Sequence, residues 1–221
     1  VNGQPKVYTT ADAPSSSYVG VYARTSNSDN VLGDINPDWT GGIKNSFKYK
    51  DFNASFLIDI QEGGNFFSLD TYYGFATGIY DRSVGNNELG NPIRNSIADG
   101  GGVILPGVNA DGSPNTTRGR TDWYANPFGY SRGMNAQHVY DASFVKLREV
   151  SIGYDFPESY IENSPFTAAS ISLIGRNLWI ISKNSPYTDP EAGLSAGNIQ
   201  GNQSGAYPSV KELGVNVKLQ F

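Results

Sequence analysis

The sequence contains no cysteine and a single histidine, His138, among its 221 residues. The absence of cysteine excludes disulfide bonds, thiolate catalysis and cysteine-based zinc sites. His138 has no histidine or cysteine partner, which disfavours a metal site or an acid–base triad built on it. Neither a nucleophile elbow nor a phosphate-binding loop accompanies it. The sequence therefore predicts a protein that is not an enzyme and that carries no metal and no cofactor.

A long apolar run and an excess of positive charge are also missing. No stretch approaches the roughly 18–20 consecutive apolar residues of a membrane-spanning helix. A strand of a membrane barrel needs only about 9–11 residues of alternating character, so this absence does not exclude a barrel. The net charge of −5 and the isoelectric point near 4.8 argue against a nucleic-acid-binding protein, which would carry a basic face.

Aromatic residues and glycine are plentiful instead. The chain has 14 tyrosines, 11 phenylalanines and 26 glycines, while its apolar fraction is only 38%. Many aromatics and much glycine, with few aliphatic residues, suit β-strands joined by polar loops, whereas packed helices favour Ala, Leu, Glu and Lys. The composition therefore predicts an all-β chain.

Apolar and polar residues alternate with a period of 2 in several segments, which predicts strands. The predicted strands lie near residues 42–50, 53–64, 138–156, 167–181 and 209–221. A tight turn joins the first two strands into a hairpin. The apolar residues change parity near Arg148–Glu149, which predicts a β-bulge there, and again near Arg176–Asn177.

Long polar stretches separate these strands. Residues 79–137 and 182–208 are rich in Gly, Asn, Asp and Pro and show no sustained period, which is typical of turns and irregular loops. Short and long connections therefore alternate along the chain. Outer-membrane β-barrels have this asymmetry, with short periplasmic turns and long extracellular loops.

The chain ends in ELGVNVKLQF, where apolar residues alternate with polar residues or glycine. We expect the odd positions, Leu213 to Phe221, to face lipid and the even positions to face a lumen. A sheet in hydrocarbon must close to satisfy its backbone groups, and about eight strands make the smallest filled barrel. The few strands here therefore predict part of a larger barrel. Further strands within residues 1–40 and 65–137 are the less favoured alternative.

Four stretches carry a resemblance to a known family. They are LGDINPDWTGGIKNSFKYKDFNASFLIDIQEGG (32–64), YDASFVKLREVSIGYDFP (140–157), ISLIGRNLWIISKNSPYTDPEAG (171–193) and YPSVKELGVNVKLQF (207–221). In order and spacing they resemble the C-terminal part of the barrel of SusC/RagA-like TonB-dependent outer-membrane transporters. The resemblance covers most of residues 32–221.

The resemblance implies an antiparallel transmembrane β-barrel of about 22 strands with a plug domain inside it. This chain would be about the last quarter of such a transporter, without the plug and the TonB box. The implied function is import of oligosaccharides or peptides across the outer membrane of a Gram-negative bacterium of the Bacteroidetes type. The implied partners are the remainder of the barrel with its plug, a SusD-like surface lipoprotein acting as a lid, the TonB complex and the lipid bilayer.

Candidate site residues fall into three groups. Aromatic rings and an arginine in the long loop suit contact with substrate or with the lid: Trp123, Tyr124, Phe128, Tyr130 and Arg132. Packing of these rings against the loop itself or the barrel mouth is the favoured interpretation, and contact with substrate or the lid is the alternative. The strand residues predicted to face the lumen are Asp59, Gln61, Ser170, Ser172 and Arg176. Phe221 resembles the terminal aromatic signal that the barrel-assembly machinery reads.

Two acidic motifs are predicted to be structural. The DINPD motif (34–38) has the spacing that opens a calcium-binding loop, but Trp39 stands where that loop needs glycine, so a turn is favoured. In TDPE (188–191) the two carboxylates flank a proline in a polar loop. This placement favours a solvated loop over a carboxylate pair.

Two other classes of function stay open at this point. One is a structural or secretion-associated outer-membrane barrel that lacks energised import. The other is a self-contained β-sandwich binding module made by these 221 residues alone.

Overall fold

A computed structural model of the chain describes residues 1–25, 30–193 and 200–221. The chain divides into two compact units, each made of segments that are far apart in sequence. The first unit comprises residues 1–33, 67–139 and 196–205, and the second comprises residues 34–66, 140–195 and 206–221. None of the helices in the described ranges is long and apolar enough to cross a membrane.

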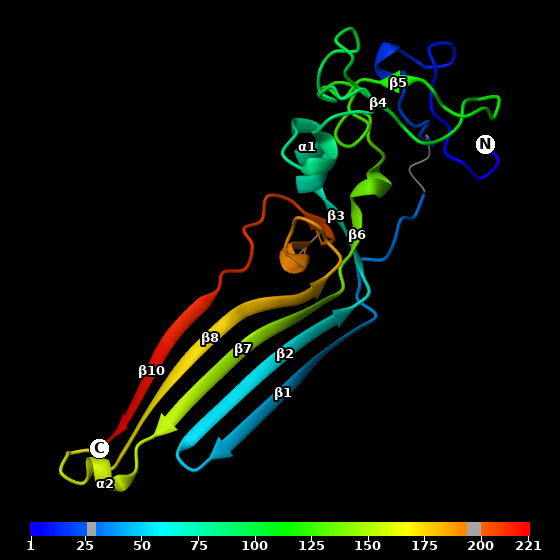
Figure 1. Cartoon of the computed structure of the whole chain (residues 1–221). Coiled ribbons are helices and arrows are strands. Elements are labelled where there is room, and N and C mark those ends of the chain that lie inside the picture. Colours follow the sequence, from blue (N-terminus) through cyan, green and yellow to red (C-terminus); the bar gives the residue numbers. More distant parts are fainter. Residues whose placement is uncertain (26–29, 194–199) are drawn as a thin grey trace. The chain divides into compact units, whose positions relative to one another are not determined.

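The second unit is built on one antiparallel sheet of five strands, which lie side by side in the order β1-β2-β7-β8-β10 (Figure 1). The strands are β1 (Trp39–Tyr49), β2 (Phe52–Glu62), β7 (Phe144–Asp155), β8 (Ala168–Lys183) and β10 (Glu212–Gln220). Within the described residues, β1 and β10 each have only one neighbour in this sheet. The sheet is therefore open at both edges, and the predicted all-β antiparallel fold of a partial barrel is confirmed.

Short connections join strands at one end of the sheet. Tyr49 pairs with Phe52, so only two residues make the turn of the β1–β2 hairpin. Lys50 adopts a φ of +52° in this turn, the left-handed conformation that two-residue hairpin turns use. The helix α2 (Glu158–Ile161) provides a single helical turn between β7 and β8.

The register of β7 changes where the sequence pattern changes parity. Leu57 pairs with Glu149, whereas Ile58 pairs with Leu147, so Arg148 is left without a partner on β2. The register between β7 and β8 also shifts at this point, since Leu147 pairs with Trp179 and Glu149 pairs with Arg176. The extra residue is a β-bulge, and it returns the apolar side chains on both sides of it to the same face of the sheet.

One face of the sheet is apolar across its full width. The register aligns Ile152 with Leu173 and Leu173 with Val215, and these side chains are 54%, 60% and 64% exposed. Their neighbours along the strands point to the opposite face, which carries charged and hydroxyl side chains. An apolar surface this wide is not stable against water, so it requires a non-aqueous neighbour.

The first unit contains shorter elements around its own core. Its elements are η1 (Ser16–Tyr18), α1 (Leu69–Thr77), η2 (Asp81–Ser83), β4 (Val103–Ile104), β5 (Arg118–Gly119), η3 (Asn135–His138) and β9 (Asn202–Gln203). β3 (Asn65–Ser68) and β6 (Val139–Asp141) lie at the boundary of the two units. Buried apolar residues include Val7, Val21, Phe75 and Val108. The predicted irregular loop 79–137 is thus part of a packed unit.

The helix α1 was not predicted, although its ends carry standard signals. The Ser68 hydroxyl accepts a hydrogen bond from the Thr71 N–H, which caps the first turn. Gly78 closes the helix with a φ of +81°, and its N–H donates to the Gly74 carbonyl. A serine and a glycine that bracket LDTYYGFAT could therefore have identified the helix.

A charge placed on the apolar face tests which face meets lipid. Val217→Arg puts a guanidinium opposite Ile171. We expect it to lower the unfolding free energy of the assembled barrel by about 2–4 kcal/mol if the site lies near the bilayer midplane. The adjacent Asn216→Arg, on the polar face, is the control and should cost much less. Urea unfolding of the full-length protein in detergent micelles measures both, and equal losses would contradict the assignment.

Candidate functional site

An exposed aromatic cluster lies in the first unit. The rings of Trp123 and Tyr130 have centroids 5.0 Å apart, and Tyr73 of α1 stacks on Tyr130 at 5.4 Å. These three side chains are 36%, 36% and 44% exposed. Tyr124 lies next to the cluster in sequence and is 71% exposed. The rings of Tyr73, Trp123 and Tyr130 are packed on one another and still present a surface to solvent.

Two of the predicted loop residues do not join this cluster. Phe128 packs beneath the guanidinium of Arg82, which lies 5.4 Å from its ring centroid. Arg132 lies 4.2 Å from the ring centroid of Tyr18 and donates a hydrogen bond to Ser17. Tyr73, which does join, was missed because it lies on a helix about 50 residues from Trp123 in sequence. A distant ring of this kind leaves no local signal.

The five strand residues predicted to face a lumen all lie on the polar face of the sheet. Ser170 pairs with Lys218 and Ser172 with Asn216. The remaining three make polar contacts: Asp59 with Arg148, Gln61 with the carbonyl of Ala142, and Arg176 with Glu149. The register therefore brings them to one surface, opposite the apolar face.

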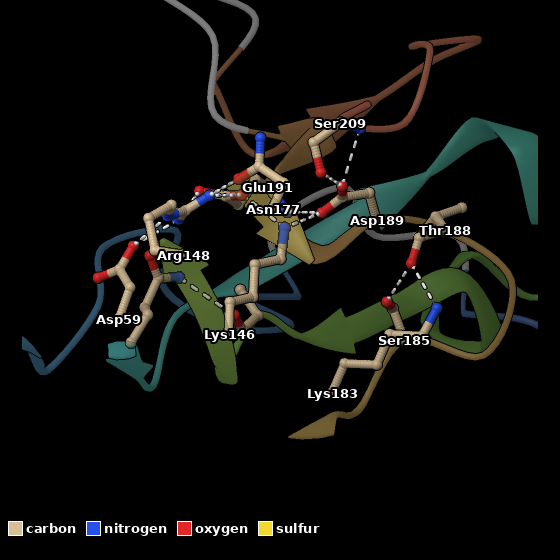
Figure 2. Close-up of polar contacts among 12 residues, drawn as sticks. Asp59, Lys146, Arg148, Asn177, Lys183, Ser185, Thr188, Asp189, Glu191 and Ser209 are labelled. Carbon is tan, nitrogen blue, oxygen red and sulfur yellow. Dashed lines mark hydrogen bonds and ion pairs between the residues drawn. The ribbon is translucent and has the colours of Figure 1, made fainter. Parts of the chain in front are cut away.

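A buried ion-pair cluster occupies the polar face near the start of β7 (Figure 2). Lys146 is 2% exposed, and its ammonium donates to Asp189 at 2.6 Å and to Glu191 at 2.5 Å. Arg148, released from pairing by the bulge, bonds both Glu191 and Asp59. Three carboxylates thus surround two cations.

The prediction that TDPE forms a solvated loop is wrong. The Asp189 side chain is 4% exposed and the Glu191 side chain is 25% exposed. Burial raises the pKa of Asp189, but hydrogen bonds from Lys146 and Ser209 outweigh that effect and leave the pKa well below its usual range. The last two residues of the motif begin the short helix η4 (Pro190–Gly193). The error arose because Lys146 lies 43 residues earlier in the chain.

The remaining motifs have structural contacts. Asp34 accepts hydrogen bonds from the backbone and side-chain nitrogens of Asn36, which is the pattern of a turn that leads into β1. Phe221 lies beyond β10 and packs edge-to-face on Phe166 with ring centroids 5.1 Å apart. Neither observation tests a calcium site or an assembly signal.

His138 lies in the core of the first unit. It is fully buried, with Phe67, Tyr72 and Phe75 around the imidazole. Its Nδ1 lies 3.1 Å from the Thr71 hydroxyl, and its Nε2 has no hydrogen-bond partner in the part of the chain that the structure describes. The residue is therefore placed as a core side chain among aromatic rings.

Comparison with known proteins gives a consistent result. No protein-family model matches the chain. TonB-dependent receptor P3 of Formosa agariphila is 28% identical over 197 residues, covering 86% of this chain and 17% of the receptor. TonB-dependent receptor P26 of the same organism is 26% identical over 198 residues, covering 86% and 18%. The chain is similar to TonB-dependent receptors. It spans less than a fifth of their length.

Solved structures support the same fold. The RagAB peptide importer in its closed-closed state has a chain that aligns with a TM-score of 0.59 and 18% identity, covering 91% of this chain and 19% of that chain. The open-open state aligns with a TM-score of 0.57 and 17% identity, covering 91% and 19%. RagA is a SusC-like protein. The resemblance to the SusC/RagA-like transporters predicted from the sequence is confirmed.

The buried His138 predicts a dependence of stability on pH. Burial lowers its pKa to about 4, and the positive charge of Arg82 adds to this effect. The unfolded value is about 6.5, so protonation favours unfolding. The contribution of neutral His138 to the unfolding free energy of this unit should be complete above pH ~6.5. It should fall by about 3 kcal/mol as the pH drops to about 4. Hydrogen exchange of peptides from α1 measures it.

His138→Gln is the control for that measurement. The amide does not titrate, so this variant should lose the pH-dependent component while keeping the contribution of other groups. An identical pH dependence in the parent protein and in His138→Gln would contradict the prediction.

Proposed function

We propose that the chain provides five barrel strands and extracellular loops to a TonB-dependent importer of oligosaccharides or peptides in the outer membrane of a Bacteroidetes-type bacterium. The observation that carries the proposal is the division of one sheet into an exposed apolar face and a charged face. A membrane barrel needs this division because one face meets hydrocarbon and the other meets a polar interior. The two open edges add support, since other strands must complete the sheet in a bilayer.

The proposed transport involves no covalent chemistry. Substrate binds at the extracellular loops, a plug inside the barrel is displaced with energy that the TonB complex delivers, and the substrate diffuses through the lumen. The polar face supplies groups that keep this path hydrated, among them Ser172 and Arg176. The similar proteins are receptors and a peptide importer, which favours transport over catalysis.

The exposed aromatic cluster suits the second partner, a SusD-like lipoprotein lid. Large rings that are partly exposed and already packed lose little conformational entropy when a partner covers them. The neighbouring structures are those of RagAB, in which a SusC-like receptor assembles with a lipoprotein. The alternative function, an outer-membrane barrel without energised import, would need no lid and no TonB-dependent step.

A topology experiment tests the membrane orientation. Tyr124→Cys lies in the proposed extracellular region and Tyr160→Cys lies in the short turn at α2, and the two tyrosines are matched at 71% and 72% exposed. On intact cells that lack the SusD-like lipoprotein, so that no lid covers the aromatic cluster, we expect a membrane-impermeant maleimide to label only Tyr124→Cys. After the outer membrane is permeabilised, it should label both variants. Labelling of Tyr160→Cys on intact cells, or of neither variant, would refute the orientation.

A binding experiment tests the lid. Trp123→Ala in the full-length receptor removes the ring that contacts both Tyr73 and Tyr130. We expect the affinity for the SusD-like lipoprotein to fall by about tenfold or more, as for a buried aromatic at an interface. Tyr160→Ala is the control and should bind normally. Unchanged co-purification of the lipoprotein with Trp123→Ala would show that the cluster is not the docking surface.

A further inference from the structure

The connection that follows β8 folds back onto the polar face of the sheet. Lys146 on that face is 2% exposed, whereas the side chain of Lys48 on the same face is 68% exposed. The difference arises because Asp189 and Glu191 of the connection lie against Lys146. One end of the polar face is therefore covered by the chain itself.

Asp189 holds two parts of the connection at once. Its Oδ1 accepts from Lys146, and its Oδ2 accepts from the backbone and the hydroxyl of Ser209 at 3.0 and 2.5 Å. Asn177 of β8 adds a second tie, since its amide donates to the Val210 carbonyl and accepts from Arg148. The segment that leaves β8 and the segment that enters β10 are thus both linked, through Asp189 and Asn177, to the two cations Lys146 and Arg148.

The chain near Thr188 is also closed on itself. The Thr188 carbonyl accepts hydrogen bonds from the ammonium of Lys183 and the hydroxyl of Ser185, both at 2.8 Å (Figure 2). Ser185 and Thr188 are buried, at 2% and 8% exposure. A short, internally bonded turn is therefore pinned at one end by β8 and at the other by Lys146.

Buried ion pairs of this kind hold the connection after β8 in one position. Several directional hydrogen bonds must form together, and a small displacement would leave charged groups buried without a partner, which is costly. An apolar contact would tolerate sliding, because it is not directional. The cluster thus favours a single fixed arrangement over a range of loop positions.

We propose that residues 184–193 are a fixed constriction, fastened by Lys146 and Arg148 to the lumen face of the barrel, and not a gate that moves during import. This proposal rests on the proposed function, because the polar face is a lumen face only in a barrel. It predicts that residues 184–193 permanently narrow the barrel lumen at the end of the strands opposite the short turns. Any movement during import then occurs in another part of the receptor.

A buried thiol in the segment reports its position. Thr188→Cys is nearly isosteric, and the Thr188 hydroxyl has no hydrogen-bond partner among the described residues, so the network keeps all its bonds. The chain has no cysteine of its own. In the full-length receptor on intact cells that lack the SusD-like lipoprotein, the rate of labelling by an impermeant maleimide is compared with that of Tyr124→Cys, and the receptor without either substitution gives the background.

We expect the Thr188→Cys thiol to react at least tenfold more slowly than the Tyr124→Cys thiol, and equally slowly in energised cells and in cells treated with a protonophore. Adding Lys146→Met should raise the labelling rate toward that of Tyr124→Cys. Lys48→Met removes an exposed lysine from the same face and should leave the rate unchanged. If the Lys146→Met receptor does not assemble, Glu191→Gln is used in its place, because it removes a single charge from the cluster.

Three results would overturn the proposal. Rapid labelling of Thr188→Cys in the otherwise unaltered receptor would show that the segment is not fastened. Slow labelling that persists with Lys146→Met or Glu191→Gln in an assembled barrel would show that the cluster is not what holds it. Faster labelling in energised cells would show a moving gate. Failure of Tyr124→Cys to label on intact cells would instead refute the proposed function.

Discussion

Each residue of a strand sends its side chain to one of two faces, and the large sheet depends on this constraint. Ile152, Leu173 and Val215 become neighbours because the hydrogen-bond register aligns them, and the alternating residues between them gather charge on the opposite face. A single-layer sheet cannot hide an apolar face by itself. The same alternation that builds the sheet therefore also requires something apolar on one side of it, and hydrocarbon meets that requirement for the proposed barrel.

The bulge in β7 shows how one irregularity serves both faces. Without the extra residue, the apolar side chains on either side of it would point to opposite faces. With it, they share a face, and Arg148 is free to reach Asp59 and Glu191. The ion-pair cluster that pins the connection after β8 thus depends on the position of the bulge. Loop placement and strand register are coupled here through a single arginine.

Structural features that depend only on neighbouring residues were predicted well from the sequence. The hairpin and the parity change near Arg148 follow from residues close together in sequence. The sequence reasoning failed where partners are distant: Asp189 lies buried against Lys146, and Tyr73 of an unpredicted helix completes the cluster of Trp123 and Tyr130. The composition around Asp189 and around Trp123 predicts a loop in both cases. Composition does not reveal which of these side chains is buried, because burial depends on what packs over the side chain.

The sequence by itself determined the strands, their two faces and the resemblance to SusC/RagA-like transporters, because a period of 2 is a property of neighbouring residues. Only the tertiary structure decided which loop residues are buried and which are presented. Asp189 and Trp123 lie in stretches of similar polar composition, yet as whole residues Asp189 is 8% exposed and Trp123 is 36% exposed. The difference arises from contacts with chain segments tens of residues away, and no local pattern records them.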